Sequence, residues 1–165
     1  DYTLVVDERA GVAQLAVFGG KITTYRRLAE AALDKLQPWL GSARGAWTHE
    51  EPLPGAVKDV AIARDLLRAR RPAMPQPLLE ALFRRHGALA DEILGDARTL
   101  ADLGRDFGGG LCEREVQWFV EREWARTADD VLWRRTKAGL HMSVAQRADF
   151  ARWFDRHRHR AATIG

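Results

Sequence analysis

The segment 16–26 constrains the fold most, because in it an apolar strand passes through two glycines and a lysine directly into a helix. Its sequence is Ala-Val-Phe-Gly-Gly-Lys-Ile-Thr-Thr-Tyr-Arg. The glycines let the backbone approach a ligand closely. From Tyr25 to Leu40, apolar residues recur at helical spacing. We therefore expect a helix that begins at Thr23 and Thr24.

The start of this helix predicts a site for an anion or an electron-rich cofactor. The first N–H groups of a helix have no partner within it, and the helix dipole places about half a positive charge there. Lys21 adds a full charge beside them. The alternative is a purely structural turn, in which Lys21 is solvated and Thr23 is an ordinary N-cap. A Walker-type loop is excluded, because Leu15 and Ile22 stand where that motif requires glycine and Ser or Thr.

The stretch from Val17 to Glu30 resembles the last strand-helix segment of the flavin domain in aerobic, FAD-dependent glycerol-3-phosphate dehydrogenases. Later motifs are similar to that family's C-terminal helical domain, in the family's order. They are Trp47 with Leu53-Pro54-Gly55, Asp102-Leu103-Gly104 with Phe107-Gly108, and Asp129-Asp130-Val131-Leu132-Trp133-Arg134-Arg135-Thr136. The resemblance runs from Asp1 to about Phe154 and points to the bacterial, membrane-associated enzyme.

The resemblance implies a specific reaction for the complete enzyme. It oxidises sn-glycerol 3-phosphate to dihydroxyacetone phosphate and passes the electrons through FAD to a membrane quinone. By the same resemblance Lys21 is the catalytic residue, and the cofactor-binding residues are Gly19, Gly20, Lys21, Ile22 and Thr23. The backbone N–H groups of Lys21, Ile22 and Thr23 then stabilise negative charge on the reduced ring. The Lys21 side chain reaches the substrate or flavin N5 through a water.

The chain also lacks parts that the whole enzyme needs. No Gly-x-Gly-x-x-Gly follows a strand, so the ADP half of FAD has no cradle here. By resemblance, the residues that grip the substrate phosphate lie upstream of Asp1. The chain begins without methionine or a signal sequence, and we expect a piece of a longer protein. Its partner is then the remaining FAD and substrate domain, and the piece alone binds FAD weakly or not at all and has no turnover.

The pattern along the chain predicts a mainly α fold. Apolar runs at 4–6 and 13–18 predict a β-hairpin, which is barely stable without a larger sheet. We expect residues 1–40 to form this hairpin and a helix of the FAD domain, and 41–56 to form a linker. Residues 57–165 then form a multi-helical C-terminal domain without strands.

Helical spacing divides the C-terminal domain further. We expect helices over 57–70, 78–85, 89–94, 113–125 and 144–160, a further turn in 96–103, a glycine loop at 108–110, and another helix starting at Asp129 and Asp130. Trp118, Trp124 and Trp133 have the spacing of core residues between helices.

Arg134 and Arg135 are candidates for docking of the helical domain onto the polar surface of the flavin domain. The alternative is surface charge paired with acids nearby in the sequence. Those acids are Asp129, Asp130 and Glu121. The sequence favours neither interpretation.

The last helix combines Trp153 with Arg152 and Arg156, which is typical of a helix that binds an anionic membrane surface. We expect Trp153 to point away from the apolar face of this helix. A merely solvated basic terminus is the alternative. The longest uncharged run is far shorter than the ~20 residues of a membrane helix. With the resemblance, this predicts a cytoplasmic protein, peripheral on the inner face of the cytoplasmic membrane.

Charge, cysteine and histidine content exclude other sites. The chain has 26 basic and 23 acidic side chains, and the net charge of +3 is too small to indicate nucleic acid. Cys112, the single cysteine, excludes an internal disulfide, and we expect a buried, inert thiol. His157 and His159 face different sides of a helix and have no third ligand nearby, so we expect no metal site.

Two other classes of function stay open at this point. One is a binding module that regulates, dimerises or touches lipid, and a homodimer is left open. The other is an unrelated flavin or nucleotide enzyme that shares only the Gly-Gly-Lys turn. FAD-dependent oxidases of glycerol phosphate share much of the pattern, with oxygen as acceptor, although the basic aromatic terminus favours quinone.

Overall fold

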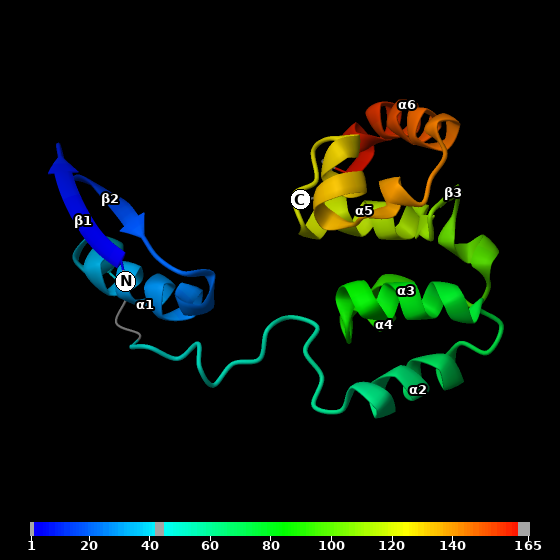
Figure 1. Cartoon of the computed structure of the whole chain (residues 1–165), viewed down its shortest axis with the longest axis horizontal. Helices are drawn as coiled ribbons and strands as arrows, with labels where there is room; N and C mark the ends of the chain where they lie inside the picture. The colour runs from blue at the N-terminus through cyan, green and yellow to red at the C-terminus, as the bar shows by residue number, and fades with distance from the viewer. Residues whose placement is uncertain (1, 42–44, 162–165) are drawn as a thin grey trace. The chain divides into compact units, whose positions relative to one another are not determined.

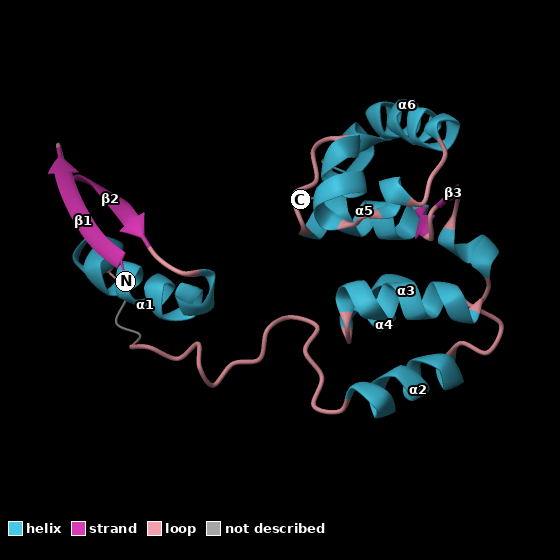
Figure 2. Cartoon of the chain, in the orientation of Figure 1, coloured by secondary structure: helices cyan, strands magenta, loops and turns pink. Residues whose placement is uncertain are grey.

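The computed structural model describes residues 2–41 and 45–161, with side chains through His157. Helices predominate and the two sheets are small, which confirms the prediction of a mainly α fold (Figures 1 and 2). The chain divides into two compact units between Leu53 and Pro54. This boundary lies inside the segment 41–56, where we expected a linker.

The first unit is a β-hairpin with one helix packed on it. Strand β1 (Tyr2–Arg9) pairs antiparallel with β2 (Val12–Gly19), and a tight turn joins them. Helix α1 (Tyr25–Leu40) contacts both strands (Figure 1). The hairpin is confirmed and is longer than expected. No described residue before Pro54 is fully buried, so this unit has no core of its own.

After α1, the chain returns to pack against the same helix. The Thr48 amide donates to Glu30 Oε1 at 3.2 Å, and the Thr48 hydroxyl donates to the same oxygen. Arg26 Nη1 donates to Glu30 at 3.1 Å. The Thr48 hydroxyl is the main cause that holds the pKa of Glu30 below its ordinary value. Part of the expected linker therefore belongs to the first unit.

The second unit is built from helices and short helical turns. The helices are α2 (Val60–Arg70), α3 (Gln76–His86), α4 (Leu89–Leu94), α5 (Glu113–Arg122) and α6 (Val144–Ala161). Short turns lie at Leu100–Leu103, Asp130–Arg135 and Ala138–Leu140. These elements lie where the sequence predicted helices, with small shifts at their ends. Helix α2, for example, begins after Asp59, whose carboxylate accepts from the Ile62 amide at 3.0 Å.

A small antiparallel sheet, β3 (Asp106–Gly108) with β4 (Leu111–Cys112), lies inside the helical unit. The prediction that no strand follows the linker is therefore wrong. Phe107 and Leu111 are 5% and 1% exposed. These short strands are thus fixed by burial of their own apolar side chains, and they are too short to show a strand period in the sequence.

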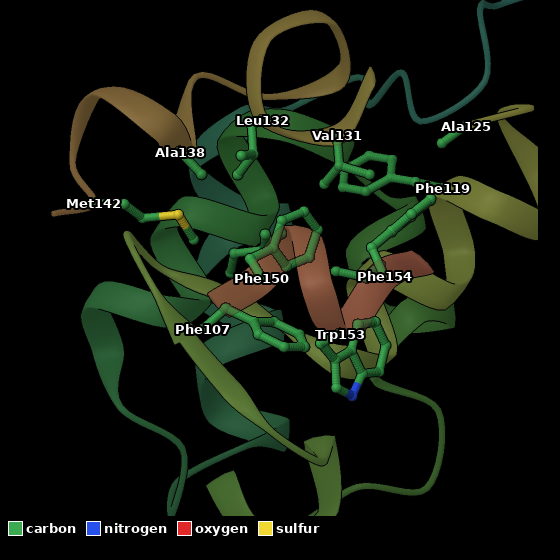
Figure 3. Packing of buried hydrophobic residues seen from close by; sticks show 12 residues of the cluster. Phe107, Phe119, Ala125, Val131, Leu132, Ala138, Met142, Phe150, Trp153 and Phe154 are labelled. Carbon is green, nitrogen blue, oxygen red and sulfur yellow. The ribbon is translucent and has the colours of Figure 1, made fainter. Parts of the chain in front are cut away.

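Two hydrophobic clusters form the core of the helical unit. The first includes Leu67, Leu79, Leu82, Ile93 and Leu94 from α2, α3 and α4. The second is aromatic and includes Phe107, Phe119, Phe150, Trp153 and Phe154, mainly from α5 and α6 (Figure 3). Trp118 packs partly buried against both clusters. Helix α5 therefore joins the two halves of this unit.

Trp124 contradicts the prediction that it packs in the core. It is 75% exposed, and its φ of 55° lies in the left-handed region. Helix α5 ends at Arg122, so Trp124 leaves the apolar stripe that the sequence extended to Ala125. Trp118 and Trp133, by contrast, pack partly buried against the core.

A close contact between two backbones fixes the start of the helical unit. The Gly55 carbonyl accepts from the Ala88 amide at 2.9 Å. A Cβ on Gly87 would lie 2.0 Å from that carbonyl oxygen, and a Cβ on Gly55 would lie 2.2 Å from the His86 carbonyl oxygen. Only glycine fits at both positions, because each has a φ in the left-handed region and backbone atoms where a side chain would be.

Asp130 caps the backbone amides of the segment that leads into its helical turn. Its Oδ2 accepts from the Arg126 and Thr127 amides, both at 2.9 Å. These bonds, that of Arg126 first, lower the pKa of Asp130 to about 2. Because the folded pKa lies below the unfolded one, the stabilisation is complete above the unfolded pKa, near 4. It is lost as the pH falls from there towards the folded value.

We expect Asp130→Ala to lower the free energy of unfolding by about 1–2 kcal/mol at neutral pH, since two amides lose their acceptor. Asp130→Asn should flatten the fall in stability between about pH 4 and 2. Urea unfolding followed by circular dichroism over a pH series measures both effects. Asp129→Ala, a change at an exposed neighbour, is the matched control, and an equal loss in that variant would contradict the capping role.

Candidate functional site

The Gly-Gly-Lys turn joins β2 to α1. Gly19 and Gly20 have φ of 79° and 108°, in the left-handed region that favours glycine. Lys21 is extended, and a 3-10 turn over Ile22–Thr24 leads into the α-helix at Tyr25. The strand, the glycine turn and the helix therefore follow one another as the sequence predicted, with the regular helix starting after the two threonines.

Within the described residues, the turn leaves three backbone N–H groups without a hydrogen-bond partner. The Thr24 amide and the Thr24 hydroxyl both donate to the Lys21 carbonyl at 2.9 Å. The N–H groups of Lys21, Ile22 and Thr23 precede this bond and have no partner within the turn. Thr23 is not the N-cap, because the caps are Lys21 for the 3-10 turn and Thr24 for α1, without side-chain caps. The alternative interpretation, a purely structural turn with Thr23 as an ordinary N-cap, is therefore wrong about Thr23.

The surface around these N–H groups is positive and apolar. Lys21 is exposed and makes no ion pair within the described part of the chain. Ile22 is 90% exposed and Phe18 is 60% exposed. Free donors, one cation and flat apolar surface suit a ligand that combines a large apolar ring with an anionic edge. A flavin has these properties, so the residues present fit that cofactor.

The two candidate docking arginines are held within the helical unit. Arg134 Nη1 donates to Asp130 Oδ1 at 2.7 Å. Arg135 donates through Nε and Nη2 to the Glu123 carbonyl at 3.0 and 2.6 Å. The surface-pair interpretation thus accounts for Arg134. Arg135 has a carbonyl partner, which leaves its positive charge uncompensated. Docking of the helical domain onto the flavin domain through Arg135 stays a prediction.

Trp153 does not point outwards as we expected. It is 8% exposed, and its ring centroid lies 4.7 Å from that of Phe107 (Figure 3). The His157 ring stacks on its other side at 4.5 Å. The inner face of α6 therefore includes Trp153, whereas Val144 in the first turn of the same helix is 74% exposed.

This correction weakens the proposed membrane surface. Arg152 and Arg156 are exposed, but the aromatic side chain that would enter the headgroup region is in the core.

His157 Nδ1 lies 2.7 Å from the Trp153 carbonyl oxygen, and the side chain of His159 lies outside the described residues. Within the described residues, no group of three or more His, Cys, Asp or Glu could hold a metal ion.

Cys112 is buried, as predicted. It is 2% exposed and is the N-cap residue of α5. Burial raises the pKa of the thiol to about 11. The thiol is therefore protonated at neutral pH, which makes it a poor nucleophile.

The sequence did not predict a buried charge cluster between α3 and α5. Glu115 has no exposed side-chain surface. It accepts from Arg85 Nε at 2.7 Å and Nη2 at 2.8 Å, and His86 Nε2 lies 2.8 Å from Glu115 Oε1. We call Arg85, His86 and Glu115 the Glu115 cluster. In the sequence, Glu115 resembles an ordinary surface acid. The basic run Arg84-Arg85-His86 is the one sequence feature that could have indicated a buried acidic partner.

Comparison with known proteins identifies one family model and several relatives that match this chain. The family model described as the C-terminal domain of alpha-glycerophosphate oxidase matches residues 46–151. D-erythritol 1-phosphate dehydrogenase of Brucella abortus (strain 2308) is 45% identical over 94% of this chain and 32% of its own length. Aerobic glycerol-3-phosphate dehydrogenase of Escherichia coli (strain K12) is 44% identical over 93% of this chain and 31% of its own.

A further relative extends the match to almost the whole chain. Glycerol-3-phosphate dehydrogenase of Pseudomonas aeruginosa (strain PAO1) is 40% identical over 97% of this chain and 32% of its own length. The chain thus spans about a third of the length of the curated relatives it matches. The resemblance that the motifs indicated is confirmed.

Proposed function

The chain belongs to the family that has the C-terminal domain of alpha-glycerophosphate oxidase, and from this we propose that it is the C-terminal part of an FAD-dependent sn-glycerol-3-phosphate dehydrogenase that passes electrons to quinone. The observation that carries the proposal is the Gly19–Thr23 turn, with its free N–H groups and Lys21. Relatives named glycerol-3-phosphate dehydrogenase support the substrate.

The residues of the turn have defined roles in this proposal. The turn would hold FAD, which would supply a hydride acceptor for the substrate when bound. The N–H groups of Lys21, Ile22 and Thr23 hold negative charge at the helix start without having to reorganise. The Lys21 ammonium adds a full positive charge beside these N–H groups. Phe18 and Ile22 offer exposed apolar surface against which the ring would pack.

The open first unit supports a role as part of a larger domain. Val12, Phe18 and Ile22 are between 60% and 90% exposed, and no described residue before Pro54 is fully buried. A two-stranded hairpin is only marginally stable without further strands or a packed face. The remaining FAD and substrate domain of the same protein would cover these side chains. We therefore propose that catalysis requires both parts.

Two variations of the function have specific support. The relative from Brucella abortus acts, by its name, on D-erythritol 1-phosphate, which is also a polyol phosphate. The family description names an oxidase, which would replace quinone with oxygen. These alternatives share the site and differ in the substrate or in the electron acceptor.

A quinone acceptor requires contact with a membrane. No helix of the described chain combines the length and apolar character needed to span one. Peripheral binding on the cytoplasmic face is therefore the arrangement we propose, with the exposed Arg152 and Arg156 as basic groups for anionic lipid. Trp153 has no part in it.

The test is an assay of the full-length enzyme loaded with FAD. We expect reduction of a soluble quinone without oxygen, and a higher kcat/KM for sn-glycerol 3-phosphate than for D-erythritol 1-phosphate. The 165-residue chain alone should show no turnover, because it lacks an ADP cradle. Dye reduction by the chain alone would contradict the placement of the site, and the reverse substrate order would select the erythritol phosphate.

A further inference from the structure

The helical unit contains a cavity of about 430 Å³ whose polar side chains are almost all basic. Its walls come from α3, the glycine turn between β3 and β4, and the segment 134–141. The basic residues of the wall are Arg84, Arg85, Arg134, Arg135, Lys137 and His141. No Asp or Glu belongs to this wall within the described residues. We call it the basic cavity.

Part of this positive charge is uncompensated. Glu115 neutralises Arg85, and Asp130 pairs with Arg134. Among the residues that the structure describes, Lys137 Nζ donates to the Trp133 carbonyl and Arg135 to the Glu123 carbonyl, and neither pairs with a carboxylate. A carbonyl oxygen accepts a hydrogen bond but does not cancel the cation. The wall therefore keeps the charges of Lys137 and Arg135 without a carboxylate partner.

Arg84 adds a third such charge. It is exposed on α3, and it forms no ion pair or side-chain hydrogen bond within the described part of the chain. Its charge faces the same cavity as those of Arg135 and Lys137. Three close cations repel one another, so an anion between them stabilises all three.

Part of the wall, at Thr136 and Arg85, is also fixed before any ligand binds. Thr136 is 5% exposed, and its hydroxyl donates to the Val131 carbonyl at 2.7 Å and accepts from the Ala138 amide at 3.1 Å. The Arg85 guanidinium is held by Glu115 and by the Gly110 carbonyl at 2.9 Å. Donors that are already ordered lose little entropy when an anion arrives.

We propose that the basic cavity binds the phosphate monoester group of a small soluble molecule. A phosphate monoester has a charge of about −1.5 to −2 near neutral pH and three acceptor oxygens, which matches several cations better than one carboxylate does. The planar fork of an arginine binds two phosphate oxygens at once. A volume of about 430 Å³ also suits a ligand larger than a bare ion.

Two other occupants offer related chemistry. Phosphatidic acid has the same phosphate monoester, and Leu140, which is 69% exposed, follows the wall in sequence. However, Arg85 and Thr136 at the floor of the cavity are 22% and 5% exposed, so a flat bilayer would reach the exposed rim but not these two residues. The other candidate occupants are carboxylates of the remaining FAD and substrate domain. A carboxylate carries one negative charge, whereas a phosphate monoester carries up to two.

The experiment is calorimetric titration of the 165-residue chain with methyl phosphate, and with acetate at equal ionic strength. We expect methyl phosphate to bind at least about tenfold more tightly than acetate. The double variant Arg84→Gln/Lys137→Gln should weaken methyl phosphate binding at least about tenfold. The double variant Arg98→Gln/Arg126→Gln removes equal charge at exposed positions outside the cavity and should change the affinity less than about twofold.

Several results would overturn the proposal. Equal binding of acetate would indicate a site for carboxylates, and equal weakening in both double variants would indicate attraction by net charge alone. Vesicles of phosphatidylcholine with and without phosphatidic acid form the lipid arm, and binding to the phosphatidic acid vesicles that is lost in Arg84→Gln/Lys137→Gln would assign the basic cavity to a membrane. Urea midpoints of each variant ensure that folded chains are compared. Methyl phosphate is not the proposed substrate, so failure here leaves the proposed dehydrogenase function untouched.

Discussion

Replacing Glu115 with alanine is expected to lower the free energy of unfolding of the helical unit by about 3 kcal/mol. The change leaves Arg85 and His86 without their shared partner at the contact between α3 and α5. Loss of one partner from a buried pair costs about 3–5 kcal/mol, and the lower end applies because Arg85 stays 22% exposed and keeps its bond to the Gly110 carbonyl.

Urea unfolding followed by the helical circular dichroism signal measures this loss. Glu121→Ala is the matched control, because Glu121 is an exposed acid on the same helix. That change should shift stability by no more than about 0.5 kcal/mol. The loss of stability in Glu115→Gln should lie between those of Glu115→Ala and Glu121→Ala, since the amide keeps one acceptor but has no charge. Equal effects of the alanine changes at 115 and 121 would show that the Glu115 cluster contributes nothing to stability.

In the full-length enzyme, Lys21→Ala is expected to lower kcat more than tenfold, which is about 1.4 kcal/mol of transition-state stabilisation. The variant removes the only cation of the Gly19–Thr23 turn and leaves its backbone N–H groups in place. FAD content should therefore change little, while the rate of flavin reduction by substrate falls. Stopped-flow absorbance of the flavin separates these two effects.

Lys35→Ala is the control for this prediction. Lys35 is an exposed lysine on α1, in the same unit, and its removal should leave kcat unchanged. Lys21→Arg keeps the charge and should retain more activity than Lys21→Ala. Unaltered flavin reduction in Lys21→Ala would reduce Lys21 to a residue of the turn.

Local patterns in the sequence were sufficient for most elements of the fold. The hairpin, the turn at Gly19 and Gly20, and helix α4 depend on residues close together in the chain. The period of apolar residues and the position of glycine determine them directly. The same holds for the candidate site at Lys21, because a contiguous segment forms it.

The errors arose where distant segments decide the structure. The arginines around Trp153 in the sequence predict a polar face of α6, and so an outward side chain. In the structure, the Phe107 ring from another segment packs against Trp153, which is buried. Glu115 looked like a surface acid until α3 brought Arg85 against it. The basic cavity likewise collects residues from separate segments. No pattern within one helix contains that information.

The contact between Gly55 and Gly87 fixes where the helical unit begins. Backbone atoms meet there without room for a methyl group, so the chain cannot pivot at Gly55 without breaking the hydrogen bond to Ala88. On the other side, Thr48 is tied to α1 through Glu30. The segment from His49 to Pro54 therefore lies between two residues that are each held inside their own unit. A side chain larger than hydrogen at either glycine would force the two backbone segments apart, so its effect would be a lower melting temperature of the helical unit.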